Sequence, residues 1–239
     1  MRRLFALALI LAAASPVAAQ TVTYEVIEEE VALSGPGADR LVDVASAVVP
    51  HGIARFGPFR VLDSNRAALV DVTDARSPAA FAAMLATYPA IAELDLIECP
   101  GTLDDVANLR LGRMIHARGL VTHVPSGGSV RSGAVELFLA GTRRSAGARA
   151  EFAVHSWIDE DGKQPADYAK NAPVNRTYLD YYREMGMSAI EAQAFYDMTN
   201  AVANADARWL NAAQMSQWVR LDKDAAMPSH MLDSGRTLR

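Results

Sequence analysis

Short apolar segments alternate with capped helical segments along the middle of this chain, and this alternation limits the fold more than any other feature. Residues 59–63 and 67–72 have the pattern of two strands joined by a tight turn. A helical segment starts at Ser77, and residues 94–99 form the next apolar strand. A strand, a helix and a further strand in succession are typical of a parallel sheet. The sequence therefore predicts an α/β fold with a mainly parallel sheet and flanking helices.

The alternation of strand and helix segments continues to the C-terminal end of a single domain, which we place at residues 59–221. Thr102 resembles the start of a capping box and opens a further helical segment, and Ser188 with Glu191 makes a capping box of the usual kind. The remaining segments are expected as helices at 102–119, 178–185 and 188–203, a last helix capped by Asn211, strands at 120–124 and 150–155, and a loose tail at 222–239.

A loop of small residues, 125–131, delivers Ser132 and Gly133 to an apolar run that ends at Gly141. This arrangement predicts a loop-to-helix elbow with Ser132 at its corner. The serine could be a nucleophile beside outward-pointing backbone amides, or it could only cap the helix, as serine commonly does. His155, at the end of the following strand, could likewise be a base or a histidine with a structural role. The residue types alone leave both alternatives open.

The N-terminus has the pattern of a secretory signal. Arg2 and Arg3 precede an apolar run at 4–14, and small residues lead up to Gln20. We expect a signal peptide at residues 1–19, an arm at 20–58 and a periplasmic or secreted mature protein. No later stretch approaches the roughly 18 consecutive apolar residues of a membrane span, so no integral membrane segment is expected after cleavage.

Composition and residue spacing argue against nucleic-acid binding, an internal disulfide and a metal site. The chain carries 28 acidic and 23 basic residues and has no basic cluster, so nucleic acid is not an expected partner. Cys99 is the sole cysteine, which rules out an internal disulfide and favours a buried residue at a strand end. His116 and His123 lack a ligand partner at helical spacing, and the acidic runs 104–105 and 159–161 lack the alternation of a calcium loop. We therefore expect no metal and no cofactor.

Three motifs, taken together, resemble the Clp protease/crotonase superfamily. They are a Pro-Gly turn after a strand (Cys99-Pro100-Gly101-Thr102), a serine 31 residues after Gly101 that opens a helix, and an apolar strand that ends in His155, 23 residues later. The resemblance covers about residues 59–220. It is strongest for exported, Clp-like predicted periplasmic proteins, in which the serine helix continues into a stretch similar to residues 138–144.

The resemblance implies a Ser-His-acid triad. Ser132 would attack a carbonyl and His155 would take and return its proton, while the amides of Gly101 and Gly133 would stabilise the oxyanion. It also makes a homo-oligomer plausible.

The acid of that triad should come from the segment 204–210, before the last helix. An alignment with the family falls on Ala207, so Asp206 is the candidate and Asn204 the reserve. Two residues depart from the family pattern: Thr102 replaces a second glycine in the turn, and Arg131 precedes the serine where a small residue is usual. Each is expected either to contact the substrate or to block the site.

Two functions from different classes remain. The first is an exported serine hydrolase of peptidase-like type that acts on a peptide or small acyl substrate. The second is a non-catalytic Clp-like fold that serves as a periplasmic binding or interaction protein. Acyl-coenzyme A chemistry, which the crotonase branch would allow, is less favoured because such thioesters are not expected outside the cytoplasm.

Overall fold

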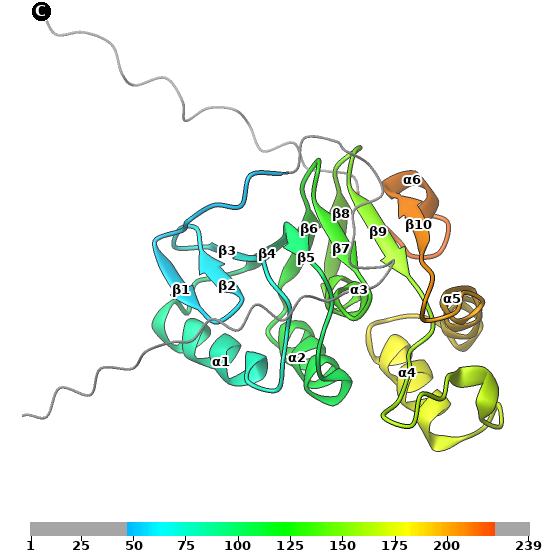
Figure 1. Cartoon of the computed structure of the whole chain (residues 1–239). Coiled ribbons are helices and arrows are strands. Elements are labelled where there is room, and N and C mark those ends of the chain that lie inside the picture. Colours follow the sequence, from blue (N-terminus) through cyan, green and yellow to red (C-terminus); the bar gives the residue numbers. More distant parts are fainter. Residues whose placement is uncertain (1–46, 223–239) are drawn as a thin grey trace, which may run out of the picture. The chain divides into compact units, whose positions relative to one another are not determined.

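A computed structural model describes residues 47–222 of the chain. The expected signal peptide, most of the expected arm and the tail beyond residue 222 lie outside the described residues. Within them the chain forms two sheets of mostly parallel strands with flanking helices, so the predicted fold class is confirmed (Figure 1).

The larger sheet has six strands in the order β1-β2-β3-β4-β6-β8. Its first three strands are antiparallel, and β3, β4, β6 and β8 run parallel. The hairpin expected at 59–72 is β2 and β3, and β1 adds a strand from the segment assigned to the arm. The bounds are β1 Ala54–Phe56, β2 Phe59–Val61, β3 Arg66–Leu69, β4 Glu93–Leu96, β6 Val121–Val124 and β8 Arg143–Ala146.

The smaller sheet has four strands in the order β10-β9-β7-β5. Strands β5, β7 and β9 are parallel, and β10 is antiparallel to β9. The chain passes from the larger sheet to the smaller one between β4 and β5, between β6 and β7, and between β8 and β9. The strand expected at 94–99 is therefore divided at Ile97, and the expected loop 125–131 contains β7. The bounds are β5 Glu98–Cys99, β7 Ser129–Arg131, β9 Glu151–Val154 and β10 Arg208–Asn211.

Helices α1, α2 and α3 pack against one face of the sheets, and α4 and α5 follow beyond β9 (Figure 1). Asp104, and not Thr102, caps α2, because its side chain accepts from the amide of Ala107. Both bonds of the predicted capping box of Ser188 and Glu191 are present at α5. The bounds are α1 Ser77–Thr87, α2 Asp105–Ala117, α3 Ala134–Leu139, α4 Pro173–Glu184, α5 Ala189–Asn200 and α6 Ala212–Met215, with a 3-10 turn η1 at Pro165–Asp167.

The buried apolar side chains of the strands belong to two separate clusters. Leu94 and Leu96 on β4 face the main core beneath the helices, and Ile97 belongs to a smaller cluster. Cys99 is fully buried, as expected, and its thiol donates to the carbonyl oxygen of Leu69 at 3.3 Å. No helix within residues 47–222 is long and apolar enough to cross a membrane.

Candidate functional site

The register of the smaller sheet brings three strand ends together. Cys99 pairs with Val130, and Val130 pairs with Phe152, so the residues that follow β5, β7 and β9 meet at one edge. Those residues include Gly101, Ser132 and His155. The amide of Ser132 donates to the carbonyl oxygen of Ala153 at 2.9 Å. The structure therefore brings the three positions of the family resemblance to the same end of one sheet.

Ser132 has a left-handed backbone, with φ of 49°, and no other non-glycine residue among those described has a positive φ. This conformation costs a serine about 1 kcal/mol or more. Helix α3 begins at Ala134 with Gly133 in the N-cap position and no side-chain cap bond. Ser132 is therefore not the helix cap that its residue type allowed. It forms a strained corner between a strand and a helix.

Two backbone amides beside this corner are available as donors. Within the described part of the chain, no hydrogen bond uses the amide of Gly101 or of Gly133. Gly101 has φ of 135°, and a Cβ placed on it would lie 3.0 Å from the Cβ of Ser132. Glycine is therefore needed at 101, both for its backbone angle and for its close approach to the serine. Free amides at such a corner can bind a developing negative charge.

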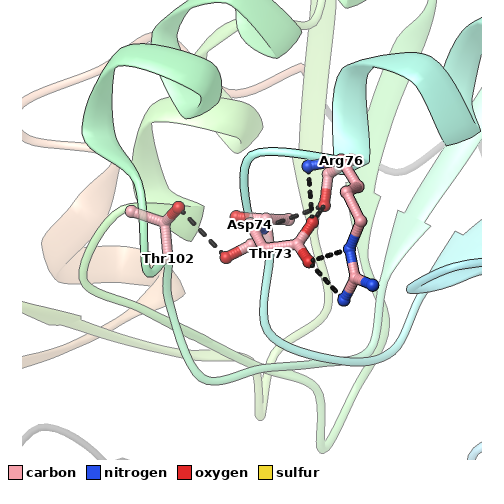
Figure 2. A network of polar contacts seen from close by, with 5 residues as sticks. Thr73, Asp74, Arg76 and Thr102 are labelled. Atoms are coloured by element: carbon pink, nitrogen blue, oxygen red, sulfur yellow. Dashed lines mark hydrogen bonds and ion pairs between the residues drawn. The ribbon is translucent and has the colours of Figure 1, made fainter.

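Thr73 holds the Pro-Gly turn in place, and Figure 2 shows its contact with Thr102. The amide of Thr73 donates to the carbonyl oxygen of Gly101 at 3.0 Å, and its own carbonyl oxygen accepts from the amide of Leu103 at 2.8 Å. The hydroxyl of Thr102 donates to that same carbonyl at 3.3 Å. Figure 2 also shows the ion pair of Asp74 with Arg76, 2.9 Å long, just before α1. The turn therefore rests on the segment that leads into α1.

Thr102 lines the site without blocking Ser132. Its methyl group lies where a side chain on Gly133 would be, since a Cβ there would come within 2.5 Å of the Thr102 Cγ2. Its hydroxyl is used by the turn. Thr102 thus supports the elbow and requires a glycine at 133.

Asn108 is a residue of the site that the sequence interpretation missed. Its side chain is 2 % exposed. Its Nδ2 donates to the carbonyl oxygen of Gly133 at 2.6 Å, and its Oδ1 accepts from the Thr73 hydroxyl at 3.0 Å. One amide thus ties α2 to the elbow and to the segment that supports the turn. A signal was present, because Asn108 falls on the same helical stripe as the apolar Leu111 and Ile115.

His155 is oriented by a backbone carbonyl. Its Nδ1 lies 2.9 Å from the carbonyl oxygen of Ser156, which can only accept, so Nδ1 carries the proton and Nε2 is the basic atom. The Nδ2 of Asn204 donates to the same carbonyl at 2.8 Å and lies 3.2 Å from the histidine Nδ1. No hydrogen bond joins the Ser132 hydroxyl to His155 among the described residues.

Asp206 is not the partner of His155, which corrects the expectation. Its side chain is exposed, and none of the described hydrogen bonds of the imidazole involves it. Arg208 pairs with Val154, so Ala207 comes next to His155 in register, as the alignment indicated. The turn before β10 then brings Asn204, the reserve candidate, back to the imidazole.

Arg131 does not contact the candidate site either. It is 3 % exposed and donates to Glu98 at 2.6 Å and to the hydroxyl of Ser129 at 2.7 Å. That hydroxyl donates in turn to Glu151 at 2.7 Å. Arg131 therefore ties β7 to β5, and it neither blocks the serine nor reaches a substrate beside it.

A cavity of about 680 Å³ opens beside the elbow. Ser132, Gly133, His155 and Asn204 all line it. Its other walls come from the start of α2, from α3, from the segment after β9 and from α4 and α5. Within residues 47–222, no group of three or more His, Cys, Asp or Glu side chains is placed to hold a metal ion.

Two carboxyl groups in this cavity have raised pKa values. Glu136 is 9 % exposed, and its burial, together with the nearby Asp105, raises its pKa to about 7 despite a hydrogen bond from the Tyr182 hydroxyl. Desolvation of the carboxyl group also raises the pKa of Asp105, although the residue as a whole is exposed. The hydroxyl of Tyr178, which donates to Asp105 at 3.0 Å, and the nearby His155 act in the opposite direction.

No protein-family model and no curated protein matches the sequence. The solved structures that the chain resembles include two of low sequence identity. A mutant of the 1510-N membrane-bound stomatin-specific protease in complex with a substrate peptide is 12% identical with a TM-score of 0.41, over 64% of this chain and 74% of that chain. A mutant of ClpP1 from Listeria monocytogenes is 13% identical with a TM-score of 0.45, over 67% of this chain and 91% of that chain.

Proposed function

We propose that this chain is an exported serine hydrolase of peptidase-like type, with Ser132 as nucleophile and His155 as base. The observation that carries the proposal is the strained backbone of Ser132, in the wall of a cavity that His155 also lines. A serine on a sharp turn from strand to helix presents its hydroxyl to a ligand, and strain of this kind collects at functional sites.

The reaction would proceed through an acyl-enzyme. The Ser132 hydroxyl attacks the carbonyl carbon of a peptide or small acyl substrate, and its proton passes to Nε2 of His155. The amides of Gly101 and Gly133 donate to the oxyanion. The C–N or C–O bond then breaks as His155 returns the proton to the leaving group. Water repeats these steps to release the acid and regenerate the serine.

The neutral hydrogen-bond partners of His155 limit the rate expected for this reaction. A carboxylate would stabilise the imidazolium formed during attack, whereas Asn204 and the Ser156 carbonyl are neutral. They fix the tautomer and the ring orientation but supply no negative charge. We therefore expect a slower hydrolase than one with a Ser-His-Asp triad.

The test is labelling of the mature protein with a fluorophosphonate probe, which modifies activated serines. Labelling is expected for the wild type and is expected to be lost in Ser132→Ala and in His155→Ala, because the first lacks the nucleophile and the second its base. Ser126→Ala is the matched control, since this exposed serine lies in the loop before β7. Absent labelling, or labelling that survives Ser132→Ala, would contradict the proposal.

A non-catalytic binding function is the second candidate, and a specific observation favours it. Among the described residues, neither a carboxylate nor the Ser132 hydroxyl is hydrogen-bonded to His155. With no activated serine, the protein would bind a ligand in this cavity without cleaving it. An unlabelled protein that nevertheless binds a ligand in this cavity would select this function.

Export and assembly are parts of the same proposal. The N-terminal signal pattern supports a periplasmic or secreted protein, and mature protein that begins near Gln20 is the expected result of N-terminal sequencing. The family resemblance supports a homo-oligomer, which light scattering of the purified mature protein would measure.

A further inference from the structure

The walls of the cavity beside Ser132 carry a charge pattern that the proposed reaction does not use. Among the described residues that line it there are several carboxyl side chains and no lysine or arginine. The acidic lining residues are Asp104, Asp105, Glu136, Asp159 and Glu160. Most of them lie near solvent, where a carboxylate needs no partner, and Glu136 alone among these five is buried.

Glu136 is that buried carboxyl group. It lies on α3 one helical turn after Ser132, so both side chains face the same cavity. Its Oε1 accepts from the Tyr182 hydroxyl at 2.9 Å, and its backbone carbonyl accepts from the Tyr181 hydroxyl at 2.6 Å. No arginine or lysine forms an ion pair with it among the described residues.

The lack of a cationic partner among the described residues distinguishes Glu136 from Arg131, another buried charged residue near the elbow. Arg131 is buried with a carboxylate partner, Glu98, at 2.6 Å. Burial of a carboxylate without a cation is unfavourable, and buried titratable groups of this kind in a cleft cluster at functional sites. The open side of Glu136 is the cavity.

Aromatic rings form another part of the cavity walls. Trp157 and Tyr178 are stacked, with ring centroids 6.3 Å apart and an interplanar angle of 2°. The indole N–H donates to the Tyr196 hydroxyl at 2.9 Å, which fixes the ring. Tyr178 also lies next to Tyr182, at 6.5 Å between centroids. Faces of Trp and Tyr rings attract ammonium and guanidinium groups.

We propose that Glu136 is the specificity-determining residue of this cavity and receives the ammonium or guanidinium group of a substrate side chain. The cation would lie between the Glu136 carboxylate and the Tyr178 and Trp157 rings, with Asp105 nearby. The substrate class is therefore a peptide or acyl compound with a basic side chain. This inference rests on the proposed function for the identity of the reacting atoms.

The experiment measures binding without catalysis. Ser132→Ala protein is titrated calorimetrically with N-acetyl-lysine methylamide, N-acetyl-arginine methylamide and N-acetyl-norleucine methylamide. The norleucine compound keeps the aliphatic chain of lysine and lacks the charge. We expect the two cationic ligands to bind at least about tenfold more tightly than the norleucine ligand, as a partly desolvated charge pair would give.

Glu136→Gln, added to Ser132→Ala, removes the charge and keeps an acceptor for Tyr182. It should reduce the affinity for both cationic ligands to that for norleucine. Glu184→Gln, which removes an equal charge from the surface of α4, should leave all three affinities unchanged. If Glu136→Gln fails to fold, Asp105→Asn tests the same charge pattern and should weaken the cationic ligands by a few-fold.

Equal binding of lysine and norleucine ligands would overturn the inference, and so would cation binding that survives both Glu136→Gln and Asp105→Asn. These measurements do not require a reactive serine. Cation-selective binding without fluorophosphonate labelling would therefore leave the cation subsite in place and reject the hydrolase. Fluorophosphonate labelling without cation-selective binding would support the hydrolase and reject the cation subsite.

Discussion

The backbone of Ser132 has a φ of 49°, a value at which glycine is free of strain and serine is not. Ser132→Gly and Ser132→Ala both remove the hydroxyl, but only the glycine relieves the strain. We expect Ser132→Gly to be more stable than Ser132→Ala by about 1 kcal/mol in urea unfolding. Neither variant should react with a fluorophosphonate. Equal stability of the two would show that the left-handed backbone carries no strain.

Asn204 and Asp206 give a second test on single residues. Asn204→Ala removes the amide that lies against His155 and Ser156, so the imidazole is held less firmly. The rate constant of fluorophosphonate labelling should fall by about tenfold, as for loss of an orienting group. Asp206→Ala should leave that rate unchanged, because the side chain is exposed. The reverse pattern would restore Asp206 as the partner of His155.

Sequence alone placed Ser132, His155 and Gly101 at strand ends, because these positions depend only on the order of the strands. It could not give the direction of Arg131 or the partner of His155. A side chain's face depends on where its strand begins, and β7 began inside an expected loop. The position of Asn204 depends on the path of a turn, which no periodicity reports.

Strands β5 and β7 lead to Gly101 and Ser132 of the candidate site, and the ion pair of Arg131 with Glu98 connects these two strands. The guanidinium side chain is 3% exposed, whereas the Glu98 side chain is 28% exposed. Glu98→Ala therefore leaves a buried cation without its carboxylate, and Arg131→Met leaves a carboxylate that water can reach. We expect Glu98→Ala to lower the free energy of unfolding by about 3 kcal/mol, and Arg131→Met by less.

Chemical denaturation of both variants checks this order, and the double variant Glu98→Ala/Arg131→Met should be more stable than Glu98→Ala alone. A larger loss in Arg131→Met than in Glu98→Ala would mean that packing of the arginine stem, and not its charge, connects the strands.

The side chain of Tyr181 on α4 packs closely against Gly112 of α2. A Cβ on this glycine would lie 1.9 Å from the hydroxyl oxygen of Tyr181, which is fully buried. Alanine usually stabilises a helix interior by about 1 kcal/mol over glycine. Here we expect Gly112→Ala to destabilise the protein by about 1–3 kcal/mol, as overpacking does. Thermal unfolding measures the change, and an increase in stability would show that the Tyr181 side chain gives way to the new methyl group.

Helices and strands with strong local signals were predicted well. The capping box at Ser188 and the hairpin at 59–72 depend on neighbours in sequence, and both are present. The division of 94–99 into β4 and β5 was not predicted, because a continuous apolar run fits one strand or two. Only the pairing of each half with a different sheet separates them.

For the whole molecule, two buried carboxyl groups make stability depend on pH. Asp95 is 7 % exposed, and burial, reinforced by Glu93, raises its pKa from 3.8 to about 7. Burial likewise raises the pKa of Glu136 from 4.5 to about 7. Both groups hold a proton more tightly in the folded state than in the unfolded chain. Stability should therefore fall as pH rises from about 4 to about 7, by on the order of 3 kcal/mol for each group.

Urea unfolding at pH 5 and pH 8 measures this slope, and Asp95→Asn/Glu136→Gln should flatten it. Asp63→Asn is the control, since hydrogen bonds and the nearby Arg66 outweigh desolvation and lower the pKa of Asp63. The stability that ionised Asp63 contributes is present above the pKa of this group in the unfolded chain and is lost only at more acidic pH. An unchanged slope in the double variant would assign the pH dependence to other groups.

The three passages of the chain from the larger sheet to the smaller one have a consequence for unfolding. Each strand that leads to a residue of the candidate site, β5, β7 or β9, comes directly after a strand of the larger sheet in the chain. One sheet therefore cannot separate while the other keeps its strands aligned. We therefore expect the described domain to melt as one cooperative unit, without a partly folded species that keeps the large sheet and loses the elbow. Heat inactivation and loss of structure would then be the same event.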